Sequence, residues 1–184
     1  TGQVIVTKGT ALQTVTTGED GKAAYTLDLP IANSYYISES QAPYGYVRNS
    51  GDVYSFNFNY LPETTAKATF SHEFVNDRTT AKIHIFKVDK ETGLPVPQGD
   101  ATLEGAVYGL YARDDIMHPD GATGVVFKAN DLVATMTTDA NGDAEVNNLY
   151  LGNYYVKEIT PPEGYLLDEE EHDVVCDYEG DLVA

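Results

Sequence analysis

The stretch SYYISESQAPYGY at residues 34–46 returns as NYYVKEITPPEGY at residues 153–165. Each copy holds a Tyr-Tyr pair, a glutamate three residues after the pair, and a proline followed by Gly-Tyr. A β-branched and aromatic run that ends in a Pro-x-Gly turn is typical of a β-strand entering a tight turn. The glutamate keeps its place in both copies, as Glu39 and Glu158.

The repeat extends upstream of this stretch. Residues 1–30 align with residues 123–151 through Thr-Gly, an apolar segment, TVTT or TMTT, and a Gly-containing turn. Several matches in the same order indicate a duplicated domain, because internal self-similarity at a long period is the signature of repeat architectures.

The local pattern is that of an all-β chain. Short alternating runs are separated by turn signals such as GEDG, NSGD, PDG and DANG, which predicts Ig-like or prealbumin-like β-sandwich domains in tandem. Only GLYARDDIM at 109–117 has a helix-like pattern. We place the boundary in NDRTT at 76–80, with a short linker at 77–80, which predicts domains at 1–78 and 79–184.

Both predicted domains are incomplete. The first copy lacks a counterpart of the segment that opens the second copy, and the second copy is short at its other end. We therefore expect residues 1–78 to lack the first strands of their domain and residues 79–184 to lack the last strand. The chain would then be a fragment of a longer array of repeats.

Composition restricts the function further. Residues 1–78 carry a net charge of −3 and residues 79–184 carry −15, so nucleic-acid phosphates would be repelled. No run of 18 apolar residues is present, so we expect no membrane contact. The single cysteine, Cys176, excludes an intrachain disulfide.

Side-chain alternation places three polar residues on apolar faces. In a strand, residues two apart share a face, so Lys87 lies with Ile83 and Ile85, and Glu158 lies with Tyr154 and Val156. By the same rule, Glu39 follows Tyr35 and Ile37, and Asn76 follows Phe70, His72 and Phe74.

A lysine, a carboxyl group and a side-chain amide on apolar faces are the parts of an amide-forming reaction. Burial of a lone charge favours the neutral form, which makes an amine nucleophilic and lets a carboxylic acid donate a hydrogen bond. The amine could attack the carboxamide and release ammonia, leaving a Lys–Asn isopeptide bond. The structural alternative is that the lysine extends to solvent at a strand end and that the glutamates bind neighbouring backbone.

At these residues the chain resembles a known family. IFKVDKETG, LEGAVYGLY and TMTTDANGDAEVNNLYLGNYYVKEITPPEGY resemble the CnaB-type, SpaA-like prealbumin-fold domains of Gram-positive surface adhesins and pilins. The resemblance implies a structural stalk or spacer in an extracellular, cell-wall-anchored protein, with neighbouring repeats as partners. It implies no enzyme beyond autocatalytic cross-linking, and no cofactor or metal.

The resemblance also implies residue roles. Lys87 would be the isopeptide donor and Glu158 the glutamate that promotes the bond, while Glu39 and Asn76 would be the promoting glutamate and the acceptor of the first copy. In this family the donor and acceptor are on the first and last strands, so we expect neither bond to close within residues 1–184. Lys8, which shares a face with Val4 and Val6, is an alternative donor for Asn76.

Other functions remain as alternatives. The 14 tyrosines suit a binding module that contacts host matrix or carbohydrate, and Glu39 with Glu158 would suit a hydrolase if the two carboxylates faced each other. Residues 139–150 begin like a calcium loop, but Ala144 and Tyr150 stand where an EF-hand needs Gly and Glu, which favours a β-turn. We interpret DEEEHD at 168–173 as a solvated acidic edge, Cys176 as a buried small residue and His72 as a core residue.

Overall fold

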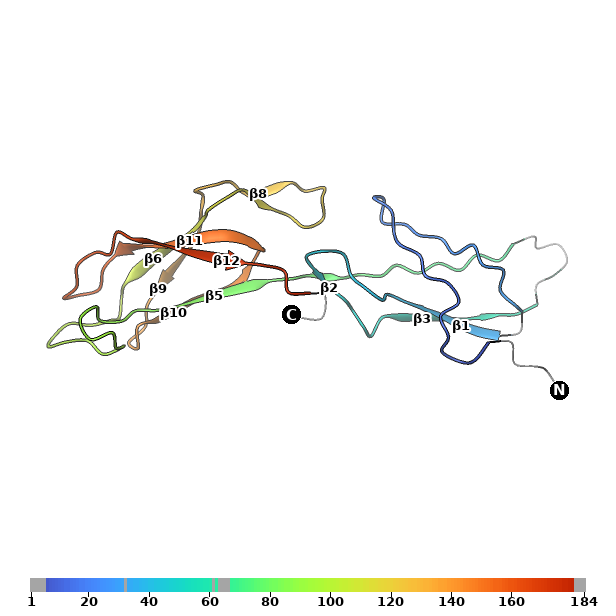
Figure 1. Cartoon of the computed structure of the whole chain (residues 1–184), viewed down its shortest axis with the longest axis horizontal. Helices are drawn as coiled ribbons and strands as arrows, with labels where there is room; N and C mark the ends of the chain where they lie inside the picture. Colours follow the sequence, from blue (N-terminus) through green and yellow to red (C-terminus); the bar gives the residue numbers. More distant parts are fainter. Residues whose placement is uncertain (1–5, 32, 61, 63–66, 181–184) are drawn as a thin grey trace. The chain divides into compact units, whose positions relative to one another are not determined.

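The computed structural model describes residues 6–31, 33–60, 62 and 67–180. Every secondary-structure element assigned in these residues is a β-strand, so the all-β prediction is confirmed. The described residues form two compact units, and the division at residue 78 that the sequence suggests stays a prediction (Figure 1). The first unit comprises Thr1–Ser38 and Val53–Glu73, and the second comprises Glu39–Asp52 and Phe74–Ala184.

The second unit is a β-sandwich of one four-stranded and one two-stranded antiparallel sheet. The larger sheet has the order β12–β11–β6–β9, formed by Glu171–Cys176, Gly152–Thr160, Val107–Ala112 and Leu132–Thr137. The smaller sheet pairs β10 (Asp143–Leu149) with β5 (Ala81–Phe86). Because β5 is paired on one side only within the described residues, its other edge is available to a further strand.

The core lies between these two sheets. Alternate residues of each strand point inward, as the period of two requires, so the inward residues of β5 and β10 in the smaller sheet meet those of β6, β9 and β11 in the larger sheet. The buried cluster consists of Ile83, Leu110, Ala112, Ile116, Met136, Ala144, Leu149, Tyr154 and Val156. Tyr154 is completely buried, and its hydroxyl donates to the Tyr150 carbonyl at 2.7 Å.

Two short ladders complete the second unit. One pairs β7 (Ile116–Met117) with β8 (Val125–Phe127), and the other pairs β2 (Tyr46–Val47) with β4 (Asp77–Arg78). The second ladder joins the turn of the first repeat to the linker segment. Both of its strands belong to the second compact unit.

The first unit is much less well packed. It holds one ladder, β1 (Asn33–Ser38) with β3 (Val53–Phe58), and Tyr35 stacks on Phe56 across this ladder with ring centroids 5.7 Å apart. No side chain that the structure describes in this unit is fully buried. A two-stranded ladder offers too little apolar surface to exclude water from both faces.

Three sequence predictions are corrected by this fold. The helix-like stretch at 109–117 forms β6 and β7, because pairing with β11 and β9 on both sides overrides its weak helical pattern. The alignment of residues 1–30 with residues 123–151 predicts strands like those of the second copy, but none is assigned in residues 6–31. There the Gln13 side chain accepts from the Thr26 and Leu27 amides. His72 is exposed and stacks on Tyr54 with ring centroids 4.9 Å apart, because the residues described in this unit form no closed core.

Candidate functional site

Lys87 and Glu158 form a buried ion pair between the two sheets of the second unit. Lys87 follows β5, and its Nζ donates to Glu158 Oε1 at 2.8 Å. The Glu158 side chain is 0% exposed and that of Lys87 is 10% exposed. The parity argument therefore gave the inward face of both residues correctly, since Lys87 continues the inward stripe of β5 and Glu158 lies on that of β11.

A backbone amide and two tyrosine rings also surround the pair. The Asp168 amide donates to the second oxygen of Glu158 at 2.7 Å, so both carboxylate oxygens are bonded. The rings of Tyr108 and Tyr165 lie 5.9 and 5.7 Å from the Lys87 nitrogen, within the range of cation–π attraction. Burial, and then the negative charge of Glu158, raise the pKa of the Tyr108 hydroxyl well above its usual value.

Asp89 continues the inward stripe one step beyond Lys87. It is buried, and its carboxylate accepts from the Thr92 amide at 2.8 Å, the Gln98 side chain at 3.0 Å and the Tyr165 hydroxyl at 3.1 Å. The hydrogen bond from the Thr92 amide makes the largest of several contributions that lower the pKa of this carboxyl to about 2. Asp89 thus holds Tyr165 in place over Lys87.

This network predicts a loss of stability in acid. Because the folded pKa of Asp89 is depressed from 3.8 to about 2, its stabilising effect is present above pH 3.8 and is lost as pH falls toward 2. We expect Asp89→Asn to unfold more easily at neutral pH and to show a shallower decline of stability across that window. Denaturant unfolding of both proteins at several pH values measures this, and parallel pH profiles would contradict it.

Gly142 fixes the backbone of Lys87. It has a φ of +83°, and its carbonyl accepts from the Lys87 amide at 2.8 Å. A Cβ at this position would lie 2.7 Å from the Lys87 carbonyl oxygen. The turn that resembles a calcium loop is therefore a β-turn in which Asp139 accepts from the amides of Asn141 and Asp143.

We expect Gly142→Ala to destabilise the second unit through both strain and collision. The left-handed conformation alone should cost about 1–2 kcal/mol. The contact with the Lys87 carbonyl should add at least about 1 kcal/mol, as overpacking does. Gly121→Ala is the matched control, because its φ is +70° and a Cβ there would meet nothing within 4 Å. Equal losses in the two variants, measured by denaturant unfolding, would contradict the collision.

Glu39 and Asn76 form the corresponding pair of the first copy. Asn76 Nδ2 donates to Glu39 Oε1 at 2.9 Å, across 37 positions of chain. The other oxygen, Oε2, is buried and has no hydrogen-bond partner among the described residues. Each glutamate thus contacts an amine or amide and not the other carboxylate, which gives no support to the hydrolase alternative.

The two copies share the register that positions these glutamates. β1 pairs Tyr35 with Phe56, and β11 pairs Tyr154 with Val174 at the equivalent position. The following turns also match, because the Tyr46 backbone amide donates to the Pro43 carbonyl at 3.1 Å and the Tyr165 backbone amide donates to the Pro162 carbonyl at 3.2 Å. Residues 178 and 60, both tyrosines, are therefore equivalent.

Sequence reasoning missed Tyr108, Asp89 and the Asp168 amide. Parity could have found Asp89, since it lies on the same face as Ile85 and Lys87. The Asp168 amide is a backbone group in a loop, and no pattern of side chains in the sequence predicts its position. Lys8, the alternative donor, is exposed and has no recorded carboxylate or amide partner in the described part of the chain.

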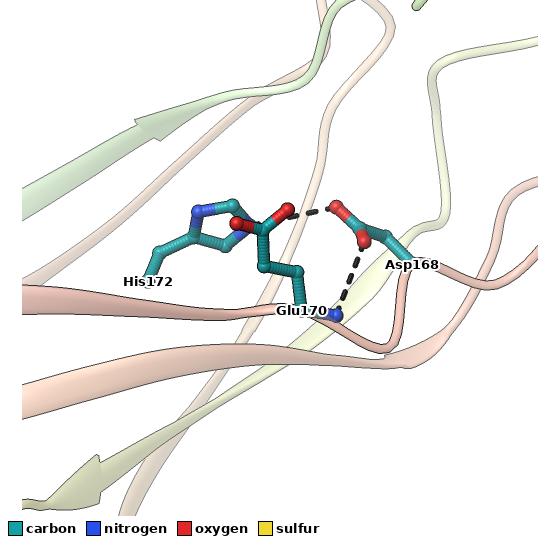
Figure 2. Close-up of side chains that lie close together, drawn as sticks. All are labelled: Asp168, Glu170 and His172. Atoms are coloured by element: carbon teal, nitrogen blue, oxygen red, sulfur yellow. Dashed lines mark hydrogen bonds and ion pairs between the residues drawn. The ribbon is translucent and has the colours of Figure 1, made fainter.

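Asp168, Glu170 and His172 lie close together at the acidic edge (Figure 2). One ligand atom from each lies within 4.8 Å of the others, and all three residues are exposed. Asp168 accepts from the Glu170 amide at 3.1 Å, which makes this a local turn. Elsewhere, Cys176 is half-buried beside the core, and burial raises the pKa of its thiol.

The sequence matches a model of a known protein family. A family model described as SpaA, prealbumin-like fold domain, matches residues 3–72 and 81–184. The chain belongs to the SpaA prealbumin-like fold domain family. The resemblance noted in the sequence is therefore confirmed, and the match covers both repeats. No curated protein matches the chain.

Three solved structures are similar to this chain to different degrees. The Bacillus anthracis TIE protein matches with 28% identity and a TM-score of 0.63, over 91% of this chain and 26% of that one. The T6 backbone pilin of serotype M6 Streptococcus pyogenes matches with 19% identity and a TM-score of 0.39, over 78% and 24% of the two chains. The group B streptococcus pilus 2b backbone protein matches with 25% identity and a TM-score of 0.36, over 58% and 38%.

The chain thus spans 26% of the TIE protein that it matches. Within the residues that the structure describes, there is no long apolar helix of the kind that crosses a membrane.

Proposed function

We propose that this chain is part of the structural stalk of a surface protein of the adhesin or pilin type. Its prealbumin-like domains act as stiff spacers on the outside of a Gram-positive cell, anchored to the cell wall through the parent protein. Neighbouring repeats of that protein are the partners. The observation that carries this proposal is the buried Lys87–Glu158 pair in a chain of the SpaA prealbumin-like family.

The pair is suited to forming an isopeptide bond. Nζ of Lys87 attacks the side-chain carbonyl carbon of an asparagine, the new C–N bond forms, and the bond to the amide nitrogen breaks. Glu158 first takes a proton from the Lys87 ammonium, because only the neutral amine has a lone pair with which to attack. A second proton of that nitrogen passes through Glu158 to the leaving nitrogen, which departs as ammonia, and Glu158 remains protonated. The product is neutral, so the cost of keeping a lysine charge out of water disappears with the reaction.

The acceptor would come from a strand added at the open edge of β5. The Glu39–Asn76 pair supports this placement, because it presents an asparagine to the equivalent glutamate at 2.9 Å. The two copies therefore hold complementary halves of one site. Lys87 and Glu158 supply the donor half, and Glu39 and Asn76 supply the acceptor half.

The proposal can be tested mechanically on an extended chain, residues 1–178 followed by residues 61–184. Because Tyr178 is equivalent to Tyr60, this chain completes the second domain with the segment that carries Asn76. Pulled from its two ends, it should fail to release the length between Lys87 and the appended Asn76. Release of the full contour length, equal to that of a variant with the appended Asn76 changed to Ala, would overturn the proposal.

A ligand-binding module is the second candidate function. Tyr36 and Tyr60 are 56% and 72% exposed, and exposed aromatic rings suit recognition. Saturable binding of the unmodified chain to host matrix or carbohydrate, reduced by replacing these tyrosines with serine, would favour this candidate.

A further inference from the structure

We infer that Asn148, Leu149 and Tyr150 form a guanidinium-binding surface that holds Arg78, which makes the predicted linker a fixed part of the second unit and not a hinge. The inference concerns residues apart from the Lys87–Glu158 pair and is independent of any cross-link. The group that binds to this surface is the arginine of the segment that precedes the second repeat.

The guanidinium of Arg78 is held on several sides. Nη1 donates to the Leu149 carbonyl at 2.8 Å, and Nη2 donates to the Asn148 side-chain oxygen at 2.8 Å and to its carbonyl at 3.2 Å. The ring of Tyr150 lies 3.9 Å from the guanidinium carbon. A planar group with several donors fits such a set of acceptors above an aromatic face, and an ammonium group does not.

The shape of β10 creates this surface. The pairing of β10 with β5 shifts register between Val146 and Leu149, and Asn148 lies in the left-handed region with a φ of +59°. A bulge of this kind turns backbone carbonyls away from the ladder. Asparagine tolerates the left-handed conformation better than most residues, and here its side chain supplies a further acceptor.

The linker is also ordered by its own backbone. Thr79 is buried, and its amide donates to the Gly45 carbonyl at 2.8 Å. β4, which contains Arg78, pairs with β2 in the turn of the first repeat. Arg78 therefore fastens both the linker and this turn to β10, and we expect bending between repeats to occur where the chain leaves the second unit.

The acceptors of Arg78 are all carbonyl and amide oxygens. The structure records no ion pair between Arg78 and a carboxylate among the described residues, although the chain carries a net charge of −18. The shape of the acceptor set, and not net charge, therefore decides the fit. The substitution Arg78→Lys keeps the charge and changes the shape of the donor group, so it tests this point directly.

Nuclear magnetic resonance relaxation of the full chain tests the inference. In the unmodified protein, the order parameter of the Thr79 amide should match rigid strand, about 0.85, and in Arg78→Ala it should fall below about 0.6. Arg78→Lys should loosen the segment nearly as much, because the charge remains and the fork is lost. Asn148→Gly, which keeps the left-handed backbone and removes one acceptor, should give an intermediate value.

Arg113→Ala is the matched control. Arg113 also lies over a tyrosine ring, Tyr155, at 4.0 Å, but it pairs with Asp173 and Glu171 on the outer face of the large sheet. This variant should leave the Thr79 order parameter unchanged. The inference fails if the linker amides of the unmodified chain are already mobile, or if they stay rigid in both Arg78 variants.

Discussion

Replacing Glu158 by alanine should destabilise the second unit by about 3–5 kcal/mol, because it leaves a buried lysine charge without its partner. The variant also removes the acceptor of the Asp168 amide. Hydrogen exchange of the β11 amides measures the loss within this unit, which matters because a chain with two units need not unfold in one step.

Two further variants make this result specific to a buried pair. Glu145→Ala breaks the Lys82–Glu145 pair, whose side chains are 53% and 46% exposed, and should cost no more than about 1 kcal/mol. The double variant Lys87→Met, Glu158→Leu should recover much of the loss, since an apolar pair of similar volume needs no compensating charge. A loss for Glu158→Ala no larger than that for Glu145→Ala would contradict a buried, uncompensated lysine.

Tyr154→Ala should be comparably severe. The ring is completely buried in the core, and removing such a side chain typically costs about 3–5 kcal/mol. Tyr154→Phe should cost only about 1–2 kcal/mol, because it keeps the ring and removes one hydrogen bond to the Tyr150 carbonyl.

The equivalent residue of the first copy supplies the control. Tyr35 also donates to a carbonyl, that of Pro30, at 2.7 Å, but it is only half-buried. Tyr35→Ala should therefore cost less than half as much as Tyr154→Ala in denaturant unfolding. Equal losses would show that the first unit is packed as tightly as the second, although none of the side chains described in it is fully buried.

Alternation along strands was enough to predict much of the candidate site. The positions of Lys87 and Glu158 follow from the period of two in β5 and β11, because a strand that packs on a core leaves little freedom in which face a residue takes. The repeat of Glu39 and Glu158 followed from one short stretch of sequence. The two ladders have the same register, which explains why the stretch has the same residue pattern in both copies.

What could not be predicted depends on contacts between distant segments. GLYARDDIM becomes strand because β11 and β9 flank it, and His72 is exposed because the described part of the first unit has no second layer. The acceptors of Arg78 are backbone carbonyls exposed by a bulge, which no side-chain pattern reports. Local sequence cannot supply such information, since it arises from contacts between segments that lie far apart in the chain, 71 positions apart for Arg78 and Leu149.

The most direct test of the account is the intact mass of the extended chain, residues 1–178 followed by residues 61–184, beside its variant with Glu158 of the completed domain changed to Ala. The account predicts that the extended chain is lighter than its sequence by the mass of one ammonia, and that the variant has its full calculated mass. Full calculated mass in both chains would contradict the cross-link, and the Lys87–Glu158 contact would then be an ion pair only.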